Sequence, residues 1–163
     1  MTGPFQDEPC GLRSACVVNG GLELVLNNTL KAIEDGRRRV LDFLAGQELA
    51  EVAHHRLEVV FEELVSNTIR HGFARNSDQS IHVRVEPRPG LVEFTFEDDG
   101  IPFNPLEATP PGPLTSIETA KIGGMGIPLV AKFCARLSYE RPAPGDSQPG
   151  FAPSNRLIVA IAT

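Results

Sequence analysis

Three segments of the chain carry polar residues or glycines at spacings that could serve a ligand, and the most informative is the stretch from Phe61 to Gly72. Glu63 and Asn67 stand four residues apart, so in a helix both side chains project from the same face, with His71 one turn further on. Residues at helical spacing predict a buried stripe beside this polar line: Leu57, Val60, Phe61, Leu64 and Thr68. Taken alone, the pair is better explained by a capped, solvated helix edge than by a binding site.

The second segment runs from Phe96 to Phe103, where an apolar strand leads directly into Asp98, Asp99 and Gly100. An aspartate at a strand end can accept a hydrogen bond from an exocyclic amine. A glycine two residues later lets the backbone approach a flat ring. By itself, an Asp-Asp-Gly sequence is more typical of a turn.

The third segment is a glycine cluster, 123–126, that opens directly into an apolar helical stretch. Its exposed backbone amides would lie at the positive end of the helix dipole, which favours a phosphate. Pro128 in the first helical turn loses no needed hydrogen bond. A flexible hinge explains a lone glycine-rich turn equally well.

The elements that must position these segments follow from periodicity and turn residues. We expect strands at 22–26, 81–86, 92–96, 137–141 and 155–162, with room for a short one at 15–18. We expect helices from a cap at 27–29 through Leu44, from about 49 to 71 with Gly72 in the left-handed position after it, and over 127–137. These elements predict a two-layer α/β sandwich, in which helices cover one face of a mixed, mostly antiparallel sheet.

The remaining stretches predict how the domain is bounded. Residues 1–21 are expected to be a loose N-terminal segment, and 22–163 a single domain without repeats. Residues 100–124 are rich in Pro, Thr and Gly and too long for a simple connector, so they predict a functional flap with a short helix near 114–120. Residues 87–90 form a predicted turn, and 142–154 a long hairpin connection.

Composition limits the function classes. Of the 163 residues, 41% are hydrophobic and 22% charged, which excludes wholesale disorder. The formal net charge of -6 argues against a nucleic-acid or anionic-membrane surface. Cys10, Cys16 and Cys134 lack the paired spacing of a zinc site and are expected to be reduced thiols. No apolar run is long enough to span a bilayer, so we expect a soluble, cytoplasmic protein.

Together and in this order, the three segments resemble the N, G1 and G2 boxes of the Bergerat-fold ATPases, which include gyrase, heat-shock chaperone ATPases and histidine kinases. The matching patterns are Glu63-x-x-x-Asn67, Asp98-x-Gly100 and Gly124-x-Gly126. Within that superfamily the chain is most similar to the small anti-sigma factor serine/threonine kinases of bacterial partner-switching systems. The continuations Thr-Ile-Arg-His-Gly-Phe after the first box and Gly-Ile-Pro-Phe-Asn-Pro in the second carry that likeness.

The resemblance implies a Bergerat fold with a flexible ATP lid at about 100–124, and a site for ATP and magnesium. It assigns Glu63 as the general base and Asn67 as the magnesium ligand. It assigns Asp98 to the adenine amine and Gly100 to the space beside the base. A carboxylate that accepts the serine hydroxyl proton and an amide oxygen on magnesium are chemically reasonable in these roles.

The same resemblance places further residues at the nucleotide. These are the glycine-rich residues, through their backbone, and their neighbours: Gly123, Gly124, Met125, Gly126 and Ile127. His71 lies after the first box and is interpreted as a helix-end residue near the nucleotide rather than a phosphorylated one. We find no phosphoacceptor-histidine helix before the first box, which disfavours a two-component sensor kinase. Lys121 and Arg70 could reach a phosphate, with a surface ion pair as the alternative for both.

The implied function is an ATP- and Mg²⁺-dependent serine/threonine kinase that phosphorylates an anti-sigma factor antagonist of the STAS-domain type. The implied partners are that antagonist and a sigma factor or another output protein, with a homodimer as the expected assembly. The alternative is a nucleotide-dependent binding module that sequesters a partner with little or no kinase activity. Glu63 favours catalysis but does not prove it.

Overall fold

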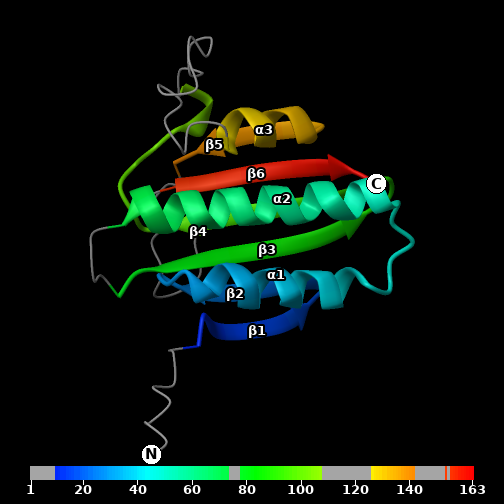
Figure 1. Ribbon diagram of the computed structural model, residues 1–163, viewed down its shortest axis with the longest axis horizontal. Helices are drawn as coiled ribbons and strands as arrows, with labels where there is room; N and C mark the ends of the chain where they lie inside the picture. Colours follow the sequence, from blue (N-terminus) through cyan, green and yellow to red (C-terminus); the bar gives the residue numbers. More distant parts are fainter. Residues whose placement is uncertain (1–9, 74–77, 108–125, 142–152, 154) are drawn as a thin grey trace, which may run out of the picture.

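The computed structural model describes residues 10–73, 78–107, 126–141, 153 and 155–163, and six strands within them form one sheet (Figure 1). The order across the sheet is β1-β2-β3-β4-β6-β5, and every neighbouring pair is antiparallel. The strands are β1 (Leu12–Val18), β2 (Gly21–Asn27), β3 (Ser80–Arg88), β4 (Leu91–Asp98), β5 (Arg136–Glu140) and β6 (Asn155–Ala162).

Three α-helices of the described chain cover one face of this sheet and lie side by side in Figure 1. They are α1 (Lys31–Leu44), α2 (Glu51–Asn67) and α3 (Gly126–Phe133), with α2 in the middle. The two-layer α/β sandwich is therefore confirmed, and the described sheet is antiparallel throughout. None of the described helices combines the length and apolar character needed to cross a membrane.

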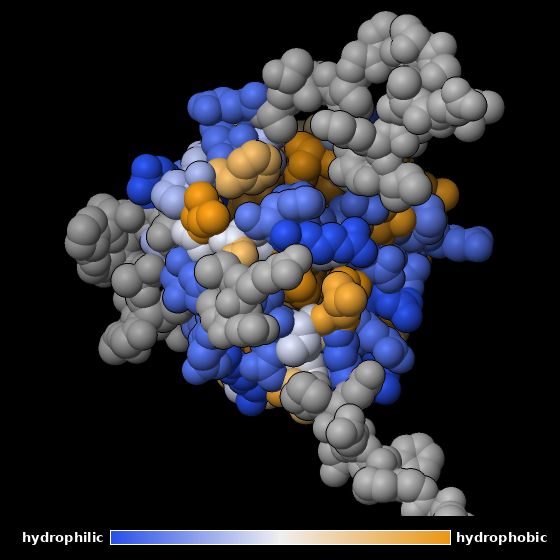
Figure 2. All heavy atoms as spheres, turned by 60° about the vertical axis from the view of Figure 1, so that its left-hand side comes forward, coloured by the Kyte–Doolittle hydropathy of each residue, from blue (hydrophilic) through white to orange (hydrophobic). Residues whose placement is uncertain are grey.

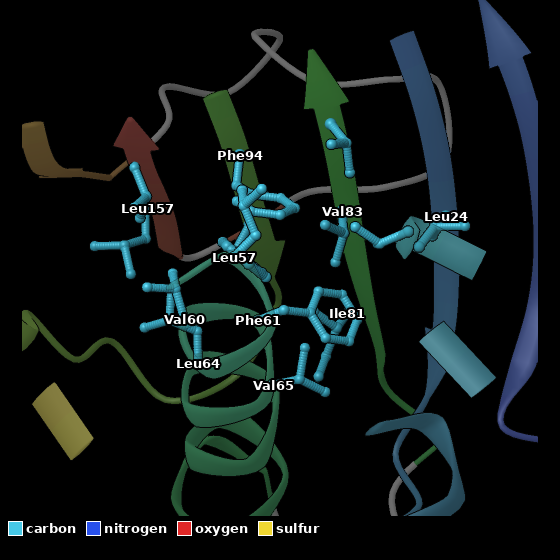
Figure 3. Packing of buried hydrophobic residues seen from close by; sticks show 14 of the residues in the cluster. Leu24, Leu57, Val60, Phe61, Leu64, Val65, Ile81, Val83, Phe94 and Leu157 are labelled. Atoms are coloured by element: carbon cyan, nitrogen blue, oxygen red, sulfur yellow. The ribbon is translucent and has the colours of Figure 1, made fainter. Parts of the chain in front are cut away.

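The core lies between α2 and the central strands (Figure 3). Alternate strand residues point at the helices and are buried, as the period of two predicts: Leu22, Leu24, Leu26, Ile81, Val83, Val85, Val92, Phe94, Phe96, Leu157, Val159 and Ile161. From α2, the Phe61 ring lies 6.4 Å from that of Phe94 and 6.2 Å from that of Phe96. Burying one such side chain stabilises the fold by about 1.5–3 kcal/mol, so this stripe fixes which way α2 faces.

The same alternation places two polar side chains on the helix side of the sheet. Asp98 continues the buried series of β4 after Phe96, and Asn155 begins the buried series of β6 before Leu157. The two residues are also direct partners in the β4–β6 register. They therefore meet at the end of the sheet toward which α2 runs, on the left in Figure 1.

The predicted cap of the first helix at 27–29 is wrong. The N-cap residue of α1 is Leu30, and no side chain bonds to the free amides there. The Asn27 side chain is engaged elsewhere, since it accepts from Arg13 Nε at 2.6 Å and donates to the Cys10 carbonyl at 2.6 Å. The Thr29 hydroxyl is buried with no hydrogen-bond partner among the described residues. The Asn27 side chain, which the local sequence favoured as a cap, is thus engaged in a long-range contact with β1 instead.

The end of the second helix also differs from the prediction. α2 ends at Asn67, and the chain continues as a π-helical segment, Thr68–Gly72. Gly72 does not adopt the predicted left-handed conformation, because the positive-φ glycines among the described residues are Gly20 and Gly90. Its carbonyl instead accepts a hydrogen bond from the Ile101 amide at 2.8 Å. A tertiary contact therefore replaces the expected helix-ending turn.

The remaining boundaries shift by a few residues. β1 is longer than the predicted strand at 15–18, and it forms inside the segment expected to be loose. The predicted turn at 87–90 tightens, because β3 extends to Arg88 and Gly90 supplies a positive φ of 75°. α3 ends at Phe133, four residues before the predicted end, and β5 begins at Arg136. Most of the predicted flap, its short helix and most of the connection at 142–154 lie outside the described residues.

Candidate functional site

A cavity of about 150 Å³ opens at the end of the sheet where β4 ends and β6 begins. Its lining is mostly apolar, with a few polar side chains among them: Leu64, Asn67, Thr68, His71, Gly72, Phe96, Asp98, Ile101, Pro102, Phe103, Pro105, Ile127, Tyr139, Asn155 and Leu157. Apolar walls with a small number of convergent polar groups are typical of sites for small organic ligands. The cavity is therefore the first candidate for function among the described residues.

Asp98 is the acidic group of this cavity. Its Oδ1 accepts hydrogen bonds from the Gly100 amide at 2.9 Å and from Asn155 Nδ2 at 2.8 Å. Among the described residues no donor reaches the other oxygen, Oδ2. Burial raises the pKa of this carboxyl, and the two hydrogen bonds partly oppose that rise. The arrangement leaves one acceptor oxygen for a ligand that carries an N–H donor.

Asn155 organises this end of the sheet and was missed in the sequence. Its Nδ2 also donates to the Ile101 carbonyl at 3.1 Å, and its Oδ1 accepts from the Phe103 amide at 3.0 Å and the Tyr139 hydroxyl at 2.8 Å. One buried amide thus ties β4, β5, β6 and the start of the 100–124 segment together. A polar residue opening an apolar strand was the available signal, but its meaning depends on the β4–β6 register.

The predicted polar line of Glu63, Asn67 and His71 lies only partly at the cavity. Asn67 and His71 both line the cavity, because the π-helical segment follows α2 directly. Wider helical turns of this kind occur often at functional sites. Arg70 lies on the exposed surface and outside the cavity lining, so its predicted contact with a phosphate stays a prediction.

Gly100 sits where two backbone segments meet. A Cβ built there would overlap the Gly72 carbonyl oxygen and lie 2.8 Å from Asp98 Oδ1. The close backbone approach is thus sufficient reason for a glycine at this position. Gly100 is not among the residues that line the cavity, and its predicted place beside a flat ring stays a prediction.

Glu63 lies one turn before Asn67 and does not line the cavity. Its side chain runs along Gly126, the first residue of α3, where an added Cβ would overlap Glu63 Oε2. Ile127, the next residue, does line the cavity. Of the other predicted phosphate contacts, four lie outside the described residues: Lys121, Gly123, Gly124 and Met125.

Large apolar side chains are exposed beside the cavity. Ile101 is 62% exposed, Phe103 46% and Leu106 49%. Figure 2, which brings forward the left-hand side of Figure 1, shows hydrophobic side chains breaking a hydrophilic surface in several places. Ile101 and Phe103 belong both to the lining and to the start of the predicted flap. An apolar rim of this kind can make contacts with a ligand or with a covering segment.

Comparison with known proteins identifies the family of the chain. Residues 26–148, more than half of the chain, match the histidine kinase-like ATPase domain. The chain belongs to that family. An ATPase domain implies a nucleotide site, and the three boxes inferred from the sequence fall within the matched residues. The resemblance to the Bergerat-fold ATPases is therefore confirmed.

Individual relatives are more distant. The chain is similar to the serine/threonine-protein kinase BtrW of Bordetella bronchiseptica, with 28% identity over 52% of this chain and 60% of that protein. It is 29% identical to the anti-sigma F factor of Bacillus velezensis, over 62% of this chain and 65% of that protein. The chain thus spans less than two thirds of the length of either relative. The histidine kinase domain of the blue-light activated histidine kinase EL346 from Erythrobacter litoralis is 12% identical, with a TM-score of 0.49, over 84% of this chain and 61% of that domain.

Proposed function

We propose that this protein is an ATP- and Mg²⁺-dependent serine/threonine kinase that also acts as an anti-sigma regulatory factor. The observation that carries the proposal is the cavity that Asp98 lines together with Asn67 and His71, in a chain of the ATPase-domain family. Among the described residues, the hydrogen bonds of Asp98 engage only its Oδ1. The similarity to a serine/threonine kinase and to anti-sigma F factors supports the choice among the activities of that family.

The residues present fit both ATP and magnesium. The apolar walls suit a flat base, and Asp98 Oδ2 suits its exocyclic amine. Mg²⁺ is commonly held by one or two protein oxygens together with phosphates and waters, so the amide oxygen of Asn67 is a sufficient protein contribution. When bound, ATP supplies the γ-phosphoryl group and magnesium neutralises its charge. The backbone of 123–126, with Lys121 and Arg70, is proposed to hold the phosphates.

Glu63 is proposed as the proton acceptor. It would take the proton of a serine or threonine hydroxyl while that oxygen bonds to the γ-phosphorus and the bond from phosphorus to the departing ADP oxygen breaks. Its carboxylate lies at the first residue of α3, beside the glycine cluster in the sequence. The hydroxyl must therefore reach the start of α3.

The proposed substrate is an anti-sigma factor antagonist of the STAS type, and the alternate partner is a sigma factor or another output protein. Phosphate on the antagonist adds negative charge, and this chain carries a net charge of -6, so repulsion would favour release of the product. The proposed kinase domain spans 22–163, with 100–124 as its lid, and acts as a cytoplasmic homodimer. These assignments rest on the family resemblance.

The kinase proposal is tested by incubating the protein with labelled ATP, Mg²⁺ and a candidate antagonist. We expect label on a serine or threonine of the antagonist, located by mass spectrometry. Glu63→Gln should retain nucleotide and slow the transfer by about a hundredfold or more, as loss of a general base does. If ATP binds but the antagonist acquires no label, the alternative of a nucleotide-dependent binding module replaces the kinase proposal.

A further inference from the structure

The glycine at the start of α3 has no backbone reason to be a glycine. The φ of Gly126 does not fall in the left-handed region, and Gly126 is helical, so an L side chain would be compatible with its backbone. An alanine in a helix is, by itself, favoured over glycine by about 1 kcal/mol. The residue must therefore be small because of what lies next to it.

The neighbour is the side chain of Glu63. A Cβ built at position 126 would overlap Glu63 Oε2, lie 3.2 Å from Cδ and lie 3.8 Å from Cβ. Among the residues that the structure describes, all three of the nearest atoms belong to this one side chain. The carboxylate also lies at the N-terminal end of α3, where the helix dipole favours negative charge.

We propose that Gly126 is a positioning residue for Glu63: the missing side chain at the start of α3 leaves the space in which the proton-accepting carboxylate lies. The inference rests on the proposed kinase function, and it gives Gly126 a role separate from any backbone contact with phosphate. Because α2 and α3 pack together and the rest of the Glu63 side chain follows α2, a larger residue at 126 would push the carboxylate away from α3.

The size of the effect follows from the overlap. To regain ordinary contact, the Glu63 carboxylate would have to move by about 1 Å, and misplacement of a catalytic group on that scale can cost about a hundredfold in rate. We expect Gly126→Ala to lower kcat for phosphate transfer by about 10- to 100-fold. The affinity for ATP should fall much less, because alanine keeps the backbone amide that is proposed to contact a phosphate. Gly46→Ala is the matched control, because a Cβ at Gly46 meets no atom within 4 Å.

The decisive comparison repeats Gly126→Ala in the Glu63→Asp background, where the shorter carboxylate leaves room for a methyl group. The proposal expects the further loss of kcat there to be less than about threefold, since contacting residues are not additive. An equal loss in both backgrounds, or a loss of ATP affinity that matches the loss of kcat, would overturn it. Those results would instead mean that Gly126 acts through a phosphate contact or only through the stability of α3.

A second readout does not depend on activity. Alanine favours the helix, and the overlapped atom is the movable end of the Glu63 side chain, so Gly126→Ala should raise the urea midpoint of unfolding less in the wild-type background than in the Glu63→Ala background, where the overlap is gone. An equal change of the midpoint in both backgrounds refutes the contact. If the wild-type protein transfers no phosphate, the kinase proposal fails, and the urea comparison still decides whether Glu63 and Gly126 are coupled.

Discussion

Asp98→Asn provides the sharpest test of ligand recognition, because it changes one acceptor oxygen into a donor without changing the shape of the side chain. Oδ1 is held by two donors, the Gly100 amide and Asn155 Nδ2. The amide of the variant must keep its oxygen there, since its NH₂ group would face both donors. The NH₂ group is therefore directed to the position of Oδ2, where the proposed ligand offers an amine. An acceptor for adenine becomes a donor that opposes it.

The expected magnitude follows from the lost hydrogen bond. A hydrogen bond to a charged group contributes about 1.5–3 kcal/mol, and each 1.4 kcal/mol is about tenfold in affinity, so Kd for ATP should rise by about 10- to 150-fold. Inosine triphosphate carries a carbonyl oxygen in place of the adenine amine. The variant should therefore bind it more tightly than the wild-type protein does, and the preference for ATP over the inosine nucleotide should fall or reverse.

Stability should move in the opposite direction from ATP binding. Because burial raises the pKa of Asp98 above 3.8, the folded chain holds this proton more tightly than the unfolded chain. The stability that this proton contributes is fully present below pH 3.8 and is lost as the pH rises through the raised pKa. At neutral pH, Asp98→Asn should therefore match or exceed the wild-type protein in stability, and the difference should vanish in acid.

The assay is calorimetric titration of both nucleotides, with urea unfolding measured on the same samples at neutral and acidic pH. Asp99→Asn is the matched control, because Asp99 is the exposed neighbour and does not line the cavity. It should leave both affinities unchanged. An Asp98→Asn variant that is folded and binds ATP as tightly as the wild-type protein would refute the assignment of the amine to Asp98.

Four other predictions concern the same end of the sheet. Asn155→Ala should cost about 1–3 kcal/mol of unfolding free energy, measured in urea, because it removes one of the two donors to Asp98 and the acceptor of the Tyr139 hydroxyl. Gly100→Ala should cost about 1–3 kcal/mol in the same assay, because its Cβ overlaps a backbone carbonyl. Asn67→Ala should abolish magnesium-dependent ATP binding in calorimetry; unchanged affinity would contradict its role. Finally, ATP affinity should fall as the pH drops through the raised pKa of Asp98, since the protonated oxygen is a poorer acceptor.

The sheet could be predicted because its signal is local. Alternation of apolar residues along β3 and β4 reports directly which side of each strand is buried. The helix ends could not be predicted in the same way, since their hydrogen bonds come from distant segments. The Asn27 side chain bonds to Arg13 of β1 and to the Cys10 carbonyl instead of capping α1, and the Gly72 carbonyl accepts a hydrogen bond from the Ile101 amide. In each case a tertiary partner outweighed the local preference.

The site residues differ in the same way: some could be predicted from the local sequence, and others depend on contacts between distant segments. Asp98 could be recognised because an acidic residue directly after an apolar strand is visible in the sequence. Asn155 could not, because 56 intervening residues separate it from Asp98 and only the β4–β6 register brings their side chains together. Its four hydrogen bonds reach β4, β5 and the 101–103 segment, none of which is near it in the chain. A buried polar residue with several long-range hydrogen bonds, such as Asn155, can be recognised only when the strand pairing is known.

The proposed roles of the polar residues of α2 and of the segment after it fall in two different places in the fold. Asn67 and His71 line the cavity, whereas Glu63, one turn earlier, lies against α3 outside it. Under the proposed roles, ligand recognition would depend on the end of the sheet, and proton transfer would depend on how α2 and α3 pack. A change at Glu63 or Gly126 could abolish transfer while leaving the cavity intact. The kinase and the sequestering module are accordingly distinguished at the α2–α3 contact, and nucleotide affinity alone cannot separate them.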